Sequence, residues 1–368
     1  MFRVCLPGVF LLLCGSLAGV HGYAATFEQV AAEAEAARDA HDVPRAIELY
    51  RSAVALHPDW QAGWWFLGTL LYGSRQYADA RNAIQHLADL NHNAGPAWGL
   101  LGLCESETGD YVDALRHVQK ALTIDGERQS ELEDVLRSRE ALLLTRNGQF
   151  DTAIERYVQF LRGGAPSEPL LAALGVAALR WPLLPAEVPA EQQKLIVRAG
   201  KAYLAMISAD PQAAGKSLRE LVEAFPSEPG VHYLYASWLI KSDQDLEIAE
   251  LKRELSIAPG SAVANQMLAW TLLQHGDIES AFPYAEAAIR ANAESPIAQA
   301  VWGRVLAETG HVKDAIHYLE SSASVDPNNL ETRIALASAY GRAGRYQDAM
   351  RERREALKLK EEAHGARN

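Results

Sequence analysis

The stretches QAGWWFLGTLLYGSRQYADARNAIQHLADL (61–90) and GPAWGLLGLCESETGDYVDALRHVQKALTI (95–124) align without a gap when one is shifted by 34 residues. The shift superposes identical residue types, among them Trp64 on Trp98, Gly68 on Gly102 and Ala80 on Ala114. A fixed period of this length predicts an array of helix-turn-helix units. Such units stack on their neighbours and present a long surface rather than enclosing a reaction chamber. The period therefore favours a binding protein over an enzyme.

The alanine of this unit recurs at both ends of the chain. The same spacing of 34 joins Ala46, Ala80 and Ala114, and again Ala281, Ala315 and Ala349. Another small residue lies twelve positions earlier in most units. Two helices that cross closely need small side chains where their backbones meet, and this pair predicts that contact. Frames of 34 residues on this register start at Phe27, Gln61, Gly95, Asp134, Leu195, Glu228, Ala262, Pro296 and Leu330.

Turn residues fall where such a unit needs them. A glycine precedes the alanine at position 20 of the frame by about five residues in five frames, and it predicts a left-handed cap that ends the first helix. Prolines lie close after the second helix, where they cannot continue it but can start the next one. The glycines are Gly109, Gly148, Gly276, Gly310 and Gly344, and the prolines are Pro58, Pro226, Pro259 and Pro327.

These residues together resemble the tetratricopeptide repeat family. Trp64–Gly68 and Trp98–Gly102, with the later alanine and in other frames the proline, match the pattern W-x2-L-G…A…P at a period of 34. The resemblance covers roughly residues 27–357. It implies an all-α fold, a right-handed superhelical solenoid with a concave groove. Members of this family usually act as protein–protein interaction scaffolds.

Two regions depart from the pattern. The frame at Glu228 carries Tyr235 and Glu247 where small residues are expected, so we expect that helix pair to cross less closely. The segment 167–193 is irregular: residues 170–179 predict a first helix, but residues 181–189 hold three prolines and cannot be helical throughout. We interpret this run as a linker that replaces a second helix and divides the array.

The predicted organisation follows from these features. Residues 25–166 form an N-terminal repeat block, and residues 167–194 form an irregular half-repeat with a proline-rich linker. Residues 195–368 form a C-terminal block that ends in a charged capping helix, which an open solenoid end requires.

The first 24 residues are predicted to be a signal peptide. Arg3 is followed by an apolar run, Val4–Val20, and then by small residues, which is the order of a secretory signal. We expect cleavage between about Gly22 and Ala25, and hence a periplasmic or secreted protein. An uncleaved N-terminal anchor is the alternative. No second apolar run is long enough to span a membrane.

Bulk composition narrows the function further. The 368 residues carry a net charge of −12 with a pI near 5.4, which argues against a nucleic-acid binder and against adsorption to anionic membranes. Cleavage of the signal would leave Cys104 as the one cysteine, without a disulfide. Its place in an apolar first helix favours a small buried hydrophobic residue over a nucleophile.

No motif for catalysis, cofactor binding or metal binding is found. The run Ala214–Ser217 resembles part of a phosphate loop, but Asp210 stands where the motif requires glycine and no strand precedes it. The eleven histidines form no pair at i, i+3 or i, i+4, so no helix displays two imidazoles on one face. We therefore predict no catalytic residue, no cofactor and no metal.

The resemblance to the repeat family implies a groove lined mainly by the first helix of each pair. Aromatic residues there are candidates for partner anchors, although the same rings could instead pack against neighbouring helices. Arg304 and Glu308 are spaced to pair with each other. The predicted partner-binding residues are Trp65, Thr69, Tyr72, Arg146, Tyr203, His232, Trp270, Gln274, Arg304 and Arg342.

Some family members grip a C-terminal carboxylate with lysine and asparagine, but Trp65 and Thr69 stand at such positions here. The groove suits an extended or helical peptide instead. The first hypothesis is thus a non-enzymatic exported scaffold that binds a protein or peptide. The alternatives are a self-assembling structural protein, as a homo-oligomer, or an accessory subunit that positions a separate enzyme.

Overall fold

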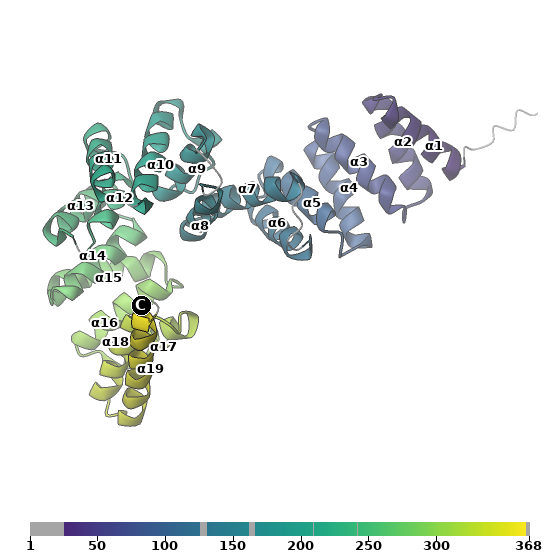
Figure 1. Cartoon of the computed structure of the whole chain (residues 1–368). Coiled ribbons are helices and arrows are strands. Elements are labelled where there is room, and N and C mark those ends of the chain that lie inside the picture. The colour runs from purple at the N-terminus through teal and green to yellow at the C-terminus, as the bar shows by residue number, and fades with distance from the viewer. Residues whose placement is uncertain (1–25, 126–130, 162–165, 209, 241, 366–368) are drawn as a thin grey trace, which may run out of the picture. The chain divides into compact units, whose positions relative to one another are not determined.

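The computed structural model describes residues 26–125, 131–161, 166–208, 210–240 and 242–365 (Figure 1). Within these ranges every regular element is a helix and no strand occurs, which confirms the predicted all-α repeat fold. The predicted signal peptide, residues 1–24, lies outside the described ranges. The chain divides into two compact units, Met1–Arg128 and Gln129–Asn368. The proline-rich segment 167–194 therefore lies inside the second unit.

The first unit consists of three helix-turn-helix pairs. Each helix packs against the next one along the chain. The helices are α1 (Phe27–Asp39), α2 (Val43–Leu56), α3 (Gln61–Gly73), α4 (Tyr77–Leu90), α5 (Gly95–Thr108) and α6 (Tyr111–Asp125).

The second unit contains the remaining helices. Its alternate helices α14, α16 and α18 lie side by side, as the first helices of stacked repeats do. The elements are α7 (Glu131–Arg146), α8 (Phe150–Leu161), α9 (Glu168–Ala178), the 3₁₀ turns η1 (Pro185–Glu187) and η2 (Ala190–Gln192), α10 (Gln193–Ile207), α11 (Pro211–Ala224), α12 (Val231–Leu239), α13 (Gln244–Ile257), α14 (Ala262–Gln274), α15 (Ile278–Ala291), α16 (Pro296–Glu308), α17 (Val312–Val325), α18 (Leu330–Arg342) and α19 (Tyr346–Gly365).

The predicted small-residue contacts hold the regular pairs together. Ala80, Ala114 and Ala315 have no exposed surface. A Cβ added to Gly102 would lie 2.9 Å from the carbonyl oxygen of Ala114, and one added to Gly303 would lie 3.2 Å from that of Ala315. The two backbones are therefore close enough that only a small residue fits between them, as the repeat pattern predicted.

In most pairs the turn between the two helices uses a left-handed residue, as predicted. Gly109, Gly148, Gly276, Gly310 and Gly344 all have φ between 74° and 89°. His41, Arg75 and Arg180 end a first helix with φ near 60°, although they carry a Cβ. The repeat geometry therefore imposes this conformation even where the sequence lacks the glycine that would adopt it without strain.

A second recurring contact closes the turn between pairs. A side chain near the start of the first helix donates a hydrogen bond to the carbonyl six residues earlier, which satisfies a backbone acceptor of the turn. The donors differ in type, so the sequence pattern did not reveal them. They are Trp64 Nε1 to Pro58 (2.7 Å), Trp98 Nε1 to His92 (2.9 Å), Asn265 Nδ2 to Pro259 (3.0 Å), Gln299 Nε2 to Ala293 (2.8 Å) and Arg333 Nε to Pro327 (3.0 Å).

The α9–α10 pair is the main departure from the regular repeat. A Cβ on Gly175 would lie 1.8 Å from the carbonyl oxygen of Ile196, and one on Gly200 would lie 1.9 Å from that of Leu171. These are the tightest backbone approaches among the described glycines. The expected linker between the two helices is folded, with two 3₁₀ turns, and α10 packs on both α9 and α11.

The register of α12 also differs from the expected one. His232 Nε2 lies 2.9 Å from the carbonyl oxygen of Pro226, six residues earlier, so His232 takes the place that Trp64 and Trp98 hold in their frames. The frame therefore starts one residue after Glu228. The residue at the close approach is then Ala236, which is completely buried, and not Tyr235. The shift is confined to α12, and Glu247 on α13 still occupies the position at which the other frames have alanine.

Candidate binding surface

The second unit contains a groove at the ends and faces of its first helices. It has a volume of about 430 Å³ and collects residues from α8, α12, α14, α16 and α18. Its lining combines apolar and polar residues. The apolar residues are Tyr233, Val263, Met267, Trp270, Ile297 and Ala300, and the polar ones are Asp151, Arg180, Gln266, Asn329 and Glu331.

Trp270 is the predicted residue that this groove contains. The indole is half-buried and packs against the core of α12–α16. The guanidinium of Arg304 lies 5.6 Å from its ring centroid, and Arg304 Nη2 donates to the carbonyl of Leu273 at 3.2 Å. These contacts hold the ring in one place while part of it faces the groove, which is the arrangement of a preorganised anchor.

A second hollow of about 350 Å³ adjoins Arg304. It is lined by Gln274, Arg304, Ala307, Glu308, Glu331, Ile334, Ala335 and Ser338. The expected Arg304–Glu308 pair does not form. Glu308 Oε2 instead accepts from Arg342 Nη2 at 2.6 Å, and Arg342 also donates to the carbonyl of Ala307. Arg304 and Arg342 each donate a hydrogen bond to a carbonyl at the end of the preceding first helix, where carbonyls have no partner within the helix. This hydrogen bond is more favourable than an exposed ion pair between residues i and i+4, which contributes little free energy.

His232, a predicted partner-binding residue, is buried and does not line the groove. Its side chain is 5% exposed and lies between Glu250 Oε2, 2.5 Å from Nδ1, and the Pro226 carbonyl. Both ring nitrogens are therefore used inside the fold. The cause is the one-residue register shift of α12, which puts Tyr233 at the groove position instead.

Arg146 and Tyr203 lie in the second unit but line neither hollow around Trp270. Arg146 Nε forms an ion pair with Glu187 Oε2 at 3.0 Å and so holds the η1 segment against α7. Tyr203 is half-buried against the α9–α12 core, and this burial raises the pKa of its phenol. Both residues have structural contacts that the sequence did not reveal.

The predicted residues of the first unit lie on α3. Trp65, Thr69 and Tyr72 are all half-buried. Thr69 Oγ1 donates to the carbonyl of Phe66 at 3.0 Å, and the Tyr72 ring lies edge-on to Tyr77 with centroids 5.3 Å apart. These three residues share a helix in the first unit, whereas Trp270 and its neighbours belong to the second.

Sequence reasoning missed several residues of the groove. Gln266 stands at the frame position that Trp65 holds in its own frame but was left out of the predicted set, and Met267 is the next residue. Tyr233 was missed because of the register of α12. Pro226 could have corrected that register, since prolines precede the frame start by three residues at Pro58, Pro259 and Pro327. Asp151 lies in the first turn of α8 and Arg180 in the turn after α9, and their ion pair at 2.6 Å has no short-range sequence signal.

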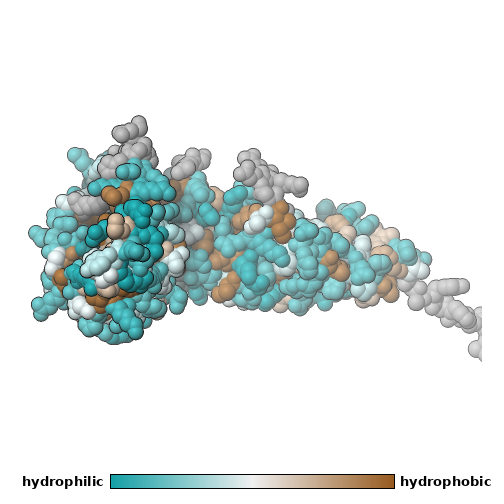
Figure 2. Space-filling view, turned by 90° about the horizontal axis from the view of Figure 1, so that it is seen from below, coloured by the Kyte–Doolittle hydropathy of each residue, from teal (hydrophilic) through white to brown (hydrophobic). Residues whose placement is uncertain are grey.

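No cluster of three potential metal ligands occurs among the described residues. Across the described helices, none combines the length and the apolar character needed to cross a bilayer. Cys104 is buried, and burial raises the pKa of its thiol to about 12. On the face seen in Figure 2, hydrophobic residues form separate small patches in a mostly hydrophilic surface.

Comparison with known proteins gives the family. A tetratricopeptide repeat model matches residues 31–74, 66–128, 267–329 and 300–364, which together exceed half of the chain. No curated protein matches the chain.

Solved structures that are similar to parts of the chain include MamA from Desulfovibrio magneticus RS-1, with 16% identity over 46% of this chain and 96% of that one and a TM-score of 0.40. MamA from AMB-1 has 22% identity over 44% of this chain and 96% of that one, with a TM-score of 0.37. The P58(IPK) TPR domain has 13% identity over 90% and 92%, with a TM-score of 0.32. From the family model and the repeat contacts above, the chain belongs to the tetratricopeptide repeat family of protein-interaction scaffolds.

Proposed function

We propose that this protein is a non-enzymatic scaffold that works outside the cytoplasm and binds a segment of a partner protein in the groove around Trp270. The observation that carries the proposal is the composition of that groove. Tyr233, Met267 and Trp270 are among its apolar lining residues, and Asp151 and Glu331 are among its polar ones. Large aromatic and apolar side chains together with polar groups are the usual composition of a protein interface.

The groove suits an extended or helical segment with at least one large apolar side chain. A half-buried tryptophan can bury further area on binding while losing little rotamer freedom, which makes it a strong anchor. Ile297 adds exposed apolar surface, with 51% of the residue accessible. Asp151 and Glu331 favour a partner that offers hydrogen-bond donors.

Site-specific photo-crosslinking tests this surface directly. A p-benzoylphenylalanine at position 266, in place of the groove residue Gln266, is compared with the same group in place of Arg290, an exposed residue of α15. The proposal expects one protein from an envelope extract to be crosslinked at 266 and not at 290. Equal crosslinking at both positions, or none at 266, contradicts it.

The product also separates the alternatives. A crosslink to a second copy of this chain favours the self-assembling structural protein. A crosslink to an enzyme favours the accessory subunit.

The extracytoplasmic location rests on Arg3 and the apolar run that follows it. Expression of the full chain, followed by cell fractionation and mass spectrometry of the N-terminus, tests this part. A protein in the periplasm or medium that starts between residues 23 and 26 supports export. A cytoplasmic protein that keeps residues 1–24 contradicts it.

A further inference from the structure

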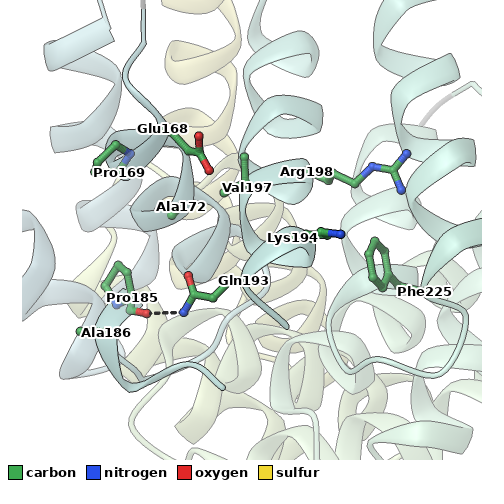
Figure 3. Close-up of a pocket in the computed structure, with 10 residues that line it drawn as sticks. All are labelled: Glu168, Pro169, Ala172, Pro185, Ala186, Gln193, Lys194, Val197, Arg198 and Phe225. Carbon is green, nitrogen blue, oxygen red and sulfur yellow. Dashed lines mark hydrogen bonds between the residues drawn. The ribbon is translucent and has the colours of Figure 1, made fainter. Parts of the chain in front are cut away.

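A second groove lies beside the folded insertion between α9 and α10 (Figure 3). Its volume is about 820 Å³, and it shares no lining residue with the groove around Trp270. The lining is mostly apolar. The lining residues are Glu168, Pro169 and Ala172 from α9, Pro185 and Ala186 from η1, Gln193, Lys194, Val197 and Arg198 from α10, and Phe225.

The wall of this groove is held in place by the fold. Gln193 Nε2 donates to the carbonyls of Pro185 at 2.9 Å and Val188 at 2.8 Å. The backbone N–H of Leu184 donates to Glu187 Oε2 at 2.7 Å, and the same oxygen pairs with Arg146. Because the insertion is already ordered, a ligand would not need to order it on binding.

The charged residues at this groove are mainly cations. Lys194 and Arg198 lie one turn apart on α10, and both extend toward Phe225 (Figure 3). Arg198 has its guanidinium 5.9 Å from the Phe225 ring centroid. Lys201 lies another turn along the same helix, and we call Lys194, Arg198 and Lys201 together the α10 stripe. Within the described ranges no carboxylate pairs with any of these three, and Glu168 is the one acidic lining residue.

Other cations of the unit do pair with carboxylates, among them Arg180 with Asp151 and Lys216 with Glu220. The protein has a net charge of −12, yet none of the described carboxylates forms an ion pair with Lys194, Arg198 or Lys201. An apolar lining together with cations that lack a carboxylate partner is complementary to a chain that carries both apolar and acidic side chains.

We propose that this groove binds an acidic peptide segment. Its apolar side chains contact Ala172, Val197 and Phe225, and its carboxylates pair with Lys194 and Arg198. A groove of this volume accommodates several side chains, so a peptide uses more of it than a small anion does. The inference adds a second binding site to the proposed function and does not depend on the groove around Trp270.

Fluorescence anisotropy with the whole chain tests the proposal. The probe is a labelled 12-residue peptide made of three Glu-Glu-Leu-Leu units, and the matched probe has lysine in place of each glutamate. Lys194→Glu with Arg198→Glu is expected to weaken binding of the acidic probe about tenfold or more. Higher salt is expected to weaken it as well, because exposed charge pairs are screened.

Three variants serve as controls. Lys194→Arg with Arg198→Lys keeps both charges and is expected to retain binding. Lys252→Glu with Lys313→Glu makes the same change of net charge on α13 and α17, and is expected to leave binding unchanged. Trp270→Ala is also expected to leave it unchanged, which separates this site from the proposed partner groove. Circular dichroism confirms that each variant is folded.

Four outcomes overturn the proposal. They are equal binding of the lysine probe, an equal loss in the α13–α17 control, an equal loss in Trp270→Ala, and no binding of the acidic probe below about 1 mM.

Discussion

The α16–α17 and α9–α10 pairs bring two helices together by different means. In α16–α17 one glycine faces an alanine, and a side chain, that of Leu319, is the nearest neighbour of Gly303. In α9–α10 a glycine on each helix faces the other helix's backbone. The first contact can adjust by moving a flexible side chain, whereas the second cannot. The irregular pair is therefore the more tightly constrained, although its sequence looks like an interruption of the array.

Substitution of either glycine at the α9–α10 crossing should have the largest effect. Gly200→Ala puts a Cβ 1.9 Å from the Leu171 carbonyl oxygen, so the helices must separate. We expect a loss of about 3 kcal/mol or more in the free energy of unfolding of the second unit. Gly341→Ala is the control, since its Cβ would meet nothing within 4 Å in α18 and alanine favours the helix. Denaturant titration compares them, and similar losses would refute the crossing argument.

The folded insertion between the two helices should be the next most sensitive feature. Gln193→Ala removes both hydrogen bonds to the Pro185 and Val188 carbonyls. We expect a loss of about 1–2 kcal/mol and faster hydrogen exchange confined to residues 181–192. Gln212→Ala, on the exposed start of α11, should change neither. Uniform acceleration across the unit would show instead that the insertion has no local role.

Glu247, one of the buried carboxyls of α13, gives the α12–α13 pair a pH dependence. Burial raises the pKa of Glu247, while a hydrogen bond from Thr271 Oγ1 at 2.5 Å opposes the shift. A raised pKa means that the folded state binds the proton more tightly than the unfolded state does. At a pH above the pKa of Glu247 in the folded state, the ionised carboxylate therefore destabilises the fold. At a pH below the pKa of Glu247 in the unfolded state, the carboxyl is protonated in both states and the destabilisation is absent.

Glu247→Gln keeps an acceptor for Thr271 and removes the charge. The variant should therefore be more stable than the parent at pH 7, and this advantage should disappear as the pH falls below 4. Urea titrations at the two pH values measure it. An advantage that is the same at both would mean that charge is not the cause.

The smallest expected effect concerns the strained caps. Arg75 ends α3 with φ near 59°, where five other frames have glycine. Arg75→Gly should stabilise the first unit by about 0.5–1 kcal/mol, because relief of the left-handed strain exceeds the added flexibility of the unfolded chain. Gly109→Ala makes the reverse change in the same unit and should destabilise it. Thermal melts of both variants measure the effect. Equal melting temperatures for Arg75→Gly and Gly109→Ala would argue against strain at the left-handed Arg75.

The repeat pattern predicted most of the regular fold because its determinants are local and recur. A left-handed cap at Gly276 or an alanine at Ala281 is chosen by the turn and by the adjacent helix, both a few residues away. Of the site, Trp270, Gln274 and Arg304 border the two hollows as the frames expected. His232 does not, because a register shift of one residue exchanges the buried and exposed positions of a helix.

The sequence by itself determined the all-α class, the period of 34 and the glycine and alanine positions, because these depend on contacts within one repeat. Only the tertiary structure decided how α9 meets α10 across the insertion, which frame α12 occupies and where Lys194 and Arg198 are left without a carboxylate to pair with. Those outcomes depend on groups far apart in the chain, such as Arg146 with Glu187. The physical reason is that the 34-residue period reflects contacts that every repeat makes, whereas a groove depends on the side chains in which neighbouring repeats differ.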